Sequence, residues 1–136
     1  MKLINVDSNF SVESLKFGNK TVEFVHNAKT MENYFPQKTL ASMFGVSQPS
    51  ISQSLKTVKQ NINDNIRDSY IIKLGVKSKR NNSNMLFYSF KVVTMLASRI
   101  NTPEAFNMLE WIDSSLNTMF NVATGKTDFN NMEVLV

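Results

Sequence analysis

The sequence predicts one α+β domain over residues 1–136, a winged helix-turn-helix with an N-terminal β-hairpin and a C-terminal helical pair. Two short helical segments meet at a glycine near residue 45, and an alternating segment with a basic, polar tip follows them. Apolar residues then return at helical spacing. With 136 residues, 42% of them apolar and none of them cysteine, the chain can build one packed core but no disulfide scaffold.

The first predicted element is a β-hairpin over residues 13–25. Two short alternating runs flank Gly18 and Asn19, a residue pair that is typical of a tight hairpin turn. The polar residues 27–33 are predicted to form a loop between this hairpin and the helices.

The helix-turn-helix is predicted over residues 36–60. Pro36 stands at a tolerated first-turn position, and Gly45 ends the first helix as its C-terminal cap. Ser47 is predicted as the N-cap of the second helix, with Pro49 in its first turn. The motif needs a small residue in the first helix, a residue tolerant of positive φ in the turn, and apolar residues after it. These positions are Ala41, Gly45, Val46, Ile51 and Leu55. A plain helical hairpin is the alternative interpretation.

The wing is predicted over about residues 69–90. One strand covers residues 69–76, a second covers 85–90, and the basic, polar segment 77–84 between them forms the tip. Because side chains alternate along a strand, the first strand has two faces. One face holds Tyr70, Ile72, Leu74 and Val76, and the other holds Ile71, Lys73 and Gly75.

Two C-terminal helices are predicted over about residues 91–122, before a tail at 123–136. The first resumes helical spacing directly after the wing. The second begins at Pro103, with Asn101 or Thr102 as its N-cap. Its apolar face consists of Phe106, Leu109, Ile112, Leu116, Met119 and Phe120.

Positive charge is concentrated between residues 36 and 80. This stretch holds eight basic and two acidic residues, whereas the whole chain has 15 and 11 and a formal charge of +4. Residues 36–63 contain neither Asp nor Glu. A surface that faces a polyanion has this pattern, and a solvated basic face without a partner is the alternative.

The second helix supplies the predicted contacts to DNA bases, because its outward face carries side chains that read base edges. A glutamine can bond an adenine edge with two hydrogen bonds, and a lysine suits guanine or phosphate. The predicted base contacts are Gln48, Ser52, Gln53 and Lys56. The predicted backbone contacts are Lys38, Ser47, Ser50, Lys59, Lys77, Lys79 and Arg80. The alternative is that these polar side chains only keep a helix face soluble.

The same residues resemble the DNA-binding region of the virulence-associated RhuM-type family, which phages, plasmids and genomic islands encode. The first matching block is Gln37-Lys38, Ala41, Phe44-Gly45-Val46-Ser47, Pro49, Ile51 and Lys56. The second block is Tyr88, Val92-Val93, Arg99, Asn101 and Trp111. The chain departs from the family pattern at Lys91 and Met108. The resemblance covers roughly residues 34–112 and implies a DNA-binding regulator of a mobile element.

The residue composition excludes several other functions. Without cysteine there is no thiol nucleophile and no Cys-based metal site, and His26 is the single histidine. No segment approaches the about 18 uncharged apolar residues that a membrane span requires. We therefore expect a cytoplasmic protein that is not an enzyme, with no catalytic residue, no metal and no cofactor.

The predicted function is sequence-specific binding of double-stranded DNA and regulation of transcription in a mobile genetic element. A homodimer is expected, with the helix at 103–122 and the apolar tail at 132–136 as its contact. The alternative is an antirepressor-like module that sequesters another regulator, with the C-terminal helix as its protein contact. The basic stretch favours DNA over this alternative, because a mimic of DNA needs acidic residues.

Overall fold

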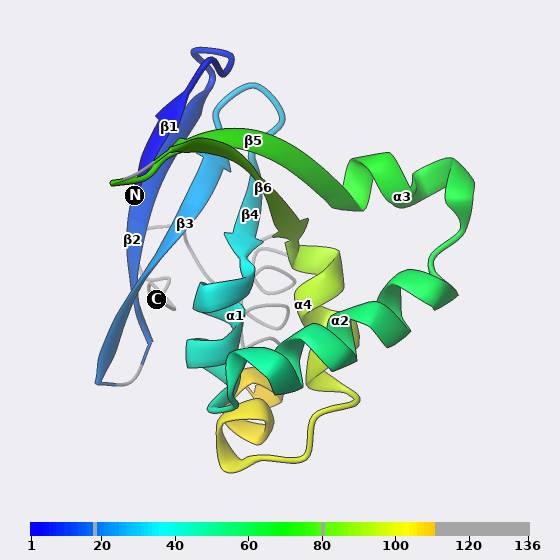
Figure 1. Ribbon diagram of the computed structural model, residues 1–136. Helices are drawn as coiled ribbons and strands as arrows, with labels where there is room; N and C mark the ends of the chain where they lie inside the picture. Colours follow the sequence, from blue (N-terminus) through cyan, green and yellow to red (C-terminus); the bar gives the residue numbers. More distant parts are fainter. Residues whose placement is uncertain (18, 80, 111–136) are drawn as a thin grey trace, which may run out of the picture.

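The computed structural model describes residues 1–17, 19–79 and 81–110 (Figure 1). Its strands are β1 (Lys2–Ile4), β2 (Phe10–Phe17), β3 (Lys20–Asn27), β4 (Glu32–Pro36), β5 (Ile71–Lys77) and β6 (Asn82–Ser89). Its helices are α1 (Gln37–Phe44), α2 (Gln48–Asn61), α3 (Asp64–Tyr70) and α4 (Phe90–Ala97), and residues 103–110 form a further helical stretch.

The predicted winged helix-turn-helix fold is wrong, because the described strands form one six-stranded antiparallel sheet. Its strand order is β1-β5-β6-β4-β3-β2. The two strands predicted as a wing therefore lie in the middle of the sheet. Strand β5 pairs with β1 on one side and with β6 on the other, and β6 also pairs with β4. Strands β1 and β4, which make this difference, have three and five residues and are too short to show a clear alternation in the sequence.

The main core lies between the sheet and the helices. Figure 1 shows α1, α2 and α4 grouped together on one side of the sheet, with α3 extending away from them. Strands β4 and β6 contribute Phe35 and Tyr88, which are directly opposite each other in the ladder. The fully buried side chains from the helices include Leu40, Phe44, Ile51, Val92, Val93 and Leu96.

A second, smaller core lies on the opposite face of the sheet. Strand β1 contacts β2 as well as β5, so the two ends of the sheet approach each other and the sheet curls toward a barrel. Figure 1 shows β5 and β6 crossing over β2 and β3. The buried residues of this cluster are Val25, Tyr34, Leu74, Val76 and Phe87. The alternation predicted for residues 71–76 is confirmed, because Leu74 and Val76 face this core and Lys73 is exposed.

The connection between α2 and β5 differs from the prediction, since residues 64–70 form α3 instead of a polar link and the start of a strand. The Asn63 side chain caps this helix by accepting a hydrogen bond of 2.9 Å from the backbone N–H of Asn65. Tyr70 is consequently the last residue of α3 and not part of the strand. Seven residues, none of them buried, give no helical stripe that the sequence alone could reveal.

Candidate nucleic-acid interface

The turn between α1 and α2 has the predicted geometry. Gly45 adopts φ 64° and ψ 36°, a left-handed conformation that glycine adopts without steric cost. The N–H groups of Gly45 and Val46 donate to the carbonyls of Ser42 and Ala41 at 3.3 and 3.1 Å, which satisfies the last turn of α1. Ser47 then caps α2, with its Oγ accepting from the N–H of Ser50 at 3.2 Å. These predicted helix ends are confirmed.

The buried face of α2 determines which side chains remain for a partner. Ile51, Leu55 and Val58 are buried against the main core, so the helix cannot rotate about its axis without exposing them. Fully burying such side chains stabilises a fold by about 1.5–3 kcal/mol each. The four predicted base contacts, Gln48, Ser52, Gln53 and Lys56, are all exposed and lie together on the solvent side of the helix.

The structure places the predicted backbone contacts in four separate regions. Ser47 and Ser50 lie at the start of α2. Lys77 and Lys79 are exposed at the far end of the β5–β6 hairpin, where Lys77 is opposite Lys2 of β1. Lys38 is exposed on α1 and lines a hollow with Glu23 of β3. Arg80 lies outside the described residues.

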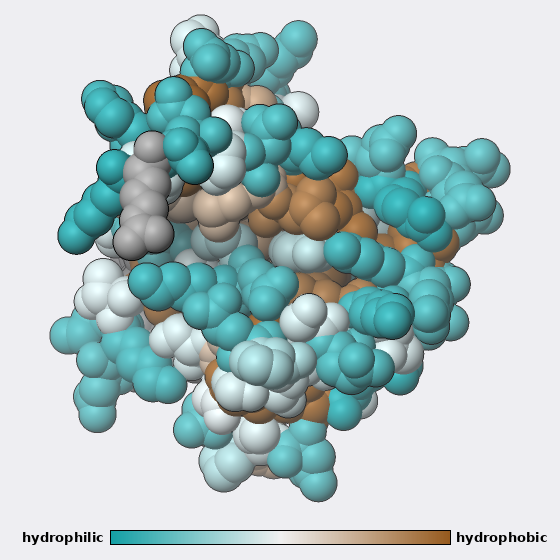
Figure 2. Space-filling view, in the orientation of Figure 1, coloured by the Kyte–Doolittle hydropathy of each residue, from teal (hydrophilic) through white to brown (hydrophobic). Residues whose placement is uncertain are grey.

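Lys59 belongs to a fourth region, a hollow of about 500 Å³ beside the end of α2. This cationic hollow is lined by Lys59, Arg67, Asp68, Ile71, Ile72, Lys73 and Leu86. Figure 2 shows hydrophobic surface between β5 and α2 with hydrophilic side chains around it. The hollow thus combines an apolar floor with three cations and one carboxylate.

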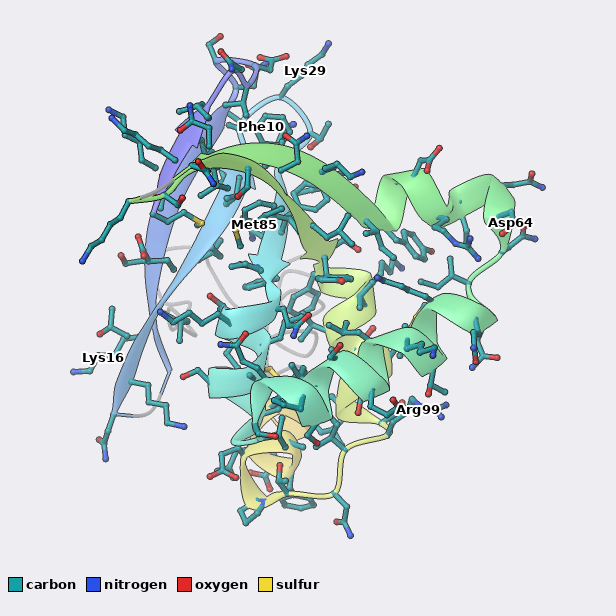
Figure 3. All side chains as sticks on the ribbon, in the orientation of Figure 1. Phe10, Lys16, Lys29, Asp64, Met85 and Arg99 are labelled. Atoms are coloured by element: carbon teal, nitrogen blue, oxygen red, sulfur yellow. The ribbon has the colours of Figure 1, made fainter. Side chains whose placement is uncertain are left out.

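Two of these cations are held in place by contacts of the fold. The ammonium of Lys59 lies 5.4 Å from the centroid of the Tyr88 ring, within range of a cation–π interaction. The Nη2 of Arg67 donates to the carbonyls of Lys59 and Ile62 at 3.2 and 3.5 Å, and it also pairs with Asp64 at 2.9 Å. Asp64 lies at the start of α3, where Figure 3 labels it. Because this carboxylate is exposed, the pair leaves the guanidinium available to an anion.

Arg67 and Lys73 were not among the predicted site residues. Their charge was visible in the basic stretch 36–80, but Arg67 was assigned to a connection and Lys73 to a wing strand. Arg67 reaches Lys59 because its side chain folds back onto the carbonyls of Lys59 and Ile62, and Lys73 lies on β5 along the same hollow. The Nε of Arg67 is buried and has no hydrogen-bond partner among the described residues.

The helical stretch 103–110 turns a different face to the core than the predicted one. Ala105 and Met108 are buried, whereas Phe106 and Leu109 are 62% and 41% exposed. Thr102 is its N-cap, because its Oγ1 accepts from the N–H of Ala105 at 3.1 Å and also donates to the carbonyl of Phe44 at 2.8 Å. Trp111, the rest of the predicted helix and the tail at 123–136 lie outside the described residues.

Within residues 1–17, 19–79 and 81–110, no group of three His, Cys, Asp or Glu side chains could hold a metal ion. The single histidine, His26, shares a hydrogen bond of 2.7 Å between its Nδ1 and the Oδ1 of Asn33. None of the described helices is both long enough and apolar enough to cross a membrane.

Comparisons of the chain with protein-family models, with curated proteins and with solved structures found no match.

Proposed function

We propose that this protein binds double-stranded DNA sequence-specifically through the exposed face of α2 and regulates transcription in a mobile genetic element. The observation that supports this most directly is the geometry of α2. A left-handed turn at Gly45 sets its start, three buried residues fix its rotation, and four side chains that can read base edges lie on its outer face. Residues 36–63 contain neither Asp nor Glu, so α1 and α2 themselves add no repulsion toward phosphate.

Two regions that could bind phosphate, one at each end of the base-reading face, support the same proposal. The start of α2 carries the positive end of the helix dipole, which favours an anion. The cationic hollow lies at the other end of the helix, with Lys59, Arg67 and Lys73 around it. A helix of 14 residues is about 21 Å long, so these two regions can contact phosphates on opposite sides of a major groove of about 12 Å.

The resemblance to the RhuM-type family favours the same proposal on largely the same residues. Its first block, residues 37–56, includes the turn and the base-reading face described above. The mobile-element part of the proposal comes only from this resemblance, because no feature of the fold indicates it.

The first experiment measures the affinity of the protein for a duplex obtained by selection from a random library, at stated salt. Replacing Gln53 by Ala is expected to weaken specific binding by about 1–3 kcal/mol and to leave binding to random duplex nearly unchanged. Gln60→Ala is the matched control, because it removes the same exposed side chain two turns further from the start of the helix, where recognition helices contact bases less. Equal losses for specific and random duplex would contradict base reading by α2.

The second experiment tests the cationic hollow as a phosphate site. Each phosphate contact contributes about 0.9 to the slope of log affinity against log salt. The double variant Arg67→Ala, Lys73→Ala is expected to flatten this slope by about 1.8 and to weaken specific and random binding alike. The variant Lys77→Ala, Lys79→Ala compares the hairpin tip with the hollow, since it removes the same number of charges. An unchanged slope in the first variant would exclude the hollow from the interface.

A protein contact through the C-terminal helix is the second candidate, and the exposed Phe106 and Leu109 favour it. Exposed large apolar side chains on one helix face are typical of a protein contact. We propose that this face forms a homodimer that binds half-sites one helical turn of DNA apart, about 34 Å. Sedimentation should show that the wild-type protein is a dimer. The double variant Phe106→Ser, Leu109→Ser should be a monomer. Binding of a repressor in place of duplex would instead support the antirepressor alternative.

A further inference from the structure

A buried hydroxyl without a hydrogen-bond partner lies at the start of α4. Its N-cap residue is Ser89, whose side chain makes no capping hydrogen bond. Ser89 is only 5% exposed, and its Oγ has no hydrogen-bond partner among the described residues. A buried hydroxyl without a partner costs about 1–3 kcal/mol of stability, so such groups are rare outside functional sites.

This hydroxyl lines a pocket of about 540 Å³ at the start of α4. The residues of this α4 pocket are Met31, Glu32, Asn33, Ser69, Tyr70, Ser89, Phe90, Lys91 and Thr94. It shares no residue with the cationic hollow or with the outer face of α2. Its volume lies within the range of about 300–1,000 Å³ that is typical of small-molecule sites.

The two sides of the α4 pocket differ in electrostatic character. On the α4 side, the helix dipole places partial positive charge at the first turn of the helix. The exposed ammonium of Lys91 adds a full charge. This side of the pocket therefore favours an anion, and the Ser89 hydroxyl can donate to it.

The β4 side carries the opposite charge, because Glu32 lines it. The Tyr34 hydroxyl donates a hydrogen bond to this carboxylate. Burial and this bond to Glu32 raise the pKa of Tyr34 to about 12, so the tyrosine stays protonated at neutral pH. The remaining lone pairs of Glu32 are available to a cationic donor. Asn33, which also lines the pocket, is held by His26 through its Oδ1.

We propose that the α4 pocket binds a small zwitterion, a free α-amino acid with an apolar side chain. The carboxylate would lie at the start of α4, against the Ser89 Oγ and Lys91, and the ammonium at Glu32. Tyr70 and Phe90 line the same pocket and supply the apolar surface for the side chain. This inference does not depend on DNA binding.

Isothermal titration with free L-phenylalanine and L-leucine tests the proposal directly on the full chain. We expect binding at millimolar concentration or below. L-phenylalaninamide lacks the carboxylate and N-acetyl-L-phenylalanine lacks the ammonium, so each should bind at least about tenfold more weakly. The absence of binding for both free amino acids, or equal affinity for the amide, would overturn the proposal.

Variants locate the binding to this pocket. Ser89→Ala removes only the hydroxyl without a partner, so the fold should keep its stability while affinity falls about tenfold. Glu32→Gln should weaken L-phenylalanine binding without changing that of the N-acetyl derivative. Lys16→Gln is the control, since this lysine lies on β2, far from α4 in Figure 3. This variant should bind the amino acid as tightly as the wild type does. Unchanged affinity in Ser89→Ala would place the ligand elsewhere and contradict the proposal.

Discussion

The α1–α2 pair and the β5–β6 hairpin have similar basic sequences but different positions in the molecule. Helix α2 has one buried face and one exposed face, and its exposed face is as predicted. The hairpin was expected to project as a wing, yet its strands are flanked by β1 and β4. Local turn signals therefore located both elements along the chain, but the surroundings of the hairpin depend on strands distant in the sequence.

The largest loss of stability is expected for Phe87→Ala in β6, which tests whether the hairpin lies inside the sheet. Phe87 is fully buried in the smaller core, so its loss should lower the free energy of unfolding by about 3–5 kcal/mol. Leu86 is the matched control, because it is the preceding residue on the other face of the strand and is 36% exposed. Its replacement by Ala should cost about 1 kcal/mol. Urea unfolding followed by circular dichroism measures both, and equal small losses would indicate a projecting wing.

A second substitution tests whether β1 covers the hairpin edge. A Cβ at Gly75 would lie 2.5 Å from the backbone carbonyl oxygen of Ile4, which cannot move aside as a side chain can. Gly75→Ala should therefore cost about 1–3 kcal/mol. Hydrogen exchange should show faster exchange of the β1 amides and little change in α2. A variant as stable and as protected as the wild type would place β1 away from β5.

The smallest expected effect concerns the turn of the two-helix unit. Gly45 has a left-handed conformation, and an added Cβ would meet only the end of the flexible Glu104 side chain. Gly45→Ala should therefore cost about 1–2 kcal/mol from the backbone conformation alone. Asn adopts this conformation more readily, so Gly45→Asn should lose less stability. Thermal unfolding of the two variants measures the difference, and the reverse order would mean that contact with Glu104 dominates.

The sequence by itself determined the elements whose signals lie within a few residues. Gly45 and Ser47 were recognised as caps because a left-handed turn and an N-cap each involve only neighbouring backbone groups. The exposed face of α2 and the two faces of β5 followed from helical and strand periodicity. All of the predicted base-contacting residues lie on the exposed face of α2, so their exposure followed from this local periodicity.

Only the tertiary structure decided what surrounds those elements. Strands β1 and β4 are too short for a periodic pattern, and their pairing converts a predicted wing into the centre of a sheet. Lys73 lines the same hollow as Lys59 only when β5 has joined the sheet, and Ser89 lines the α4 pocket with Glu32 only when β6 pairs with β4. Such contacts join residues far apart in the chain, and no local pattern of residue types encodes which distant segments meet.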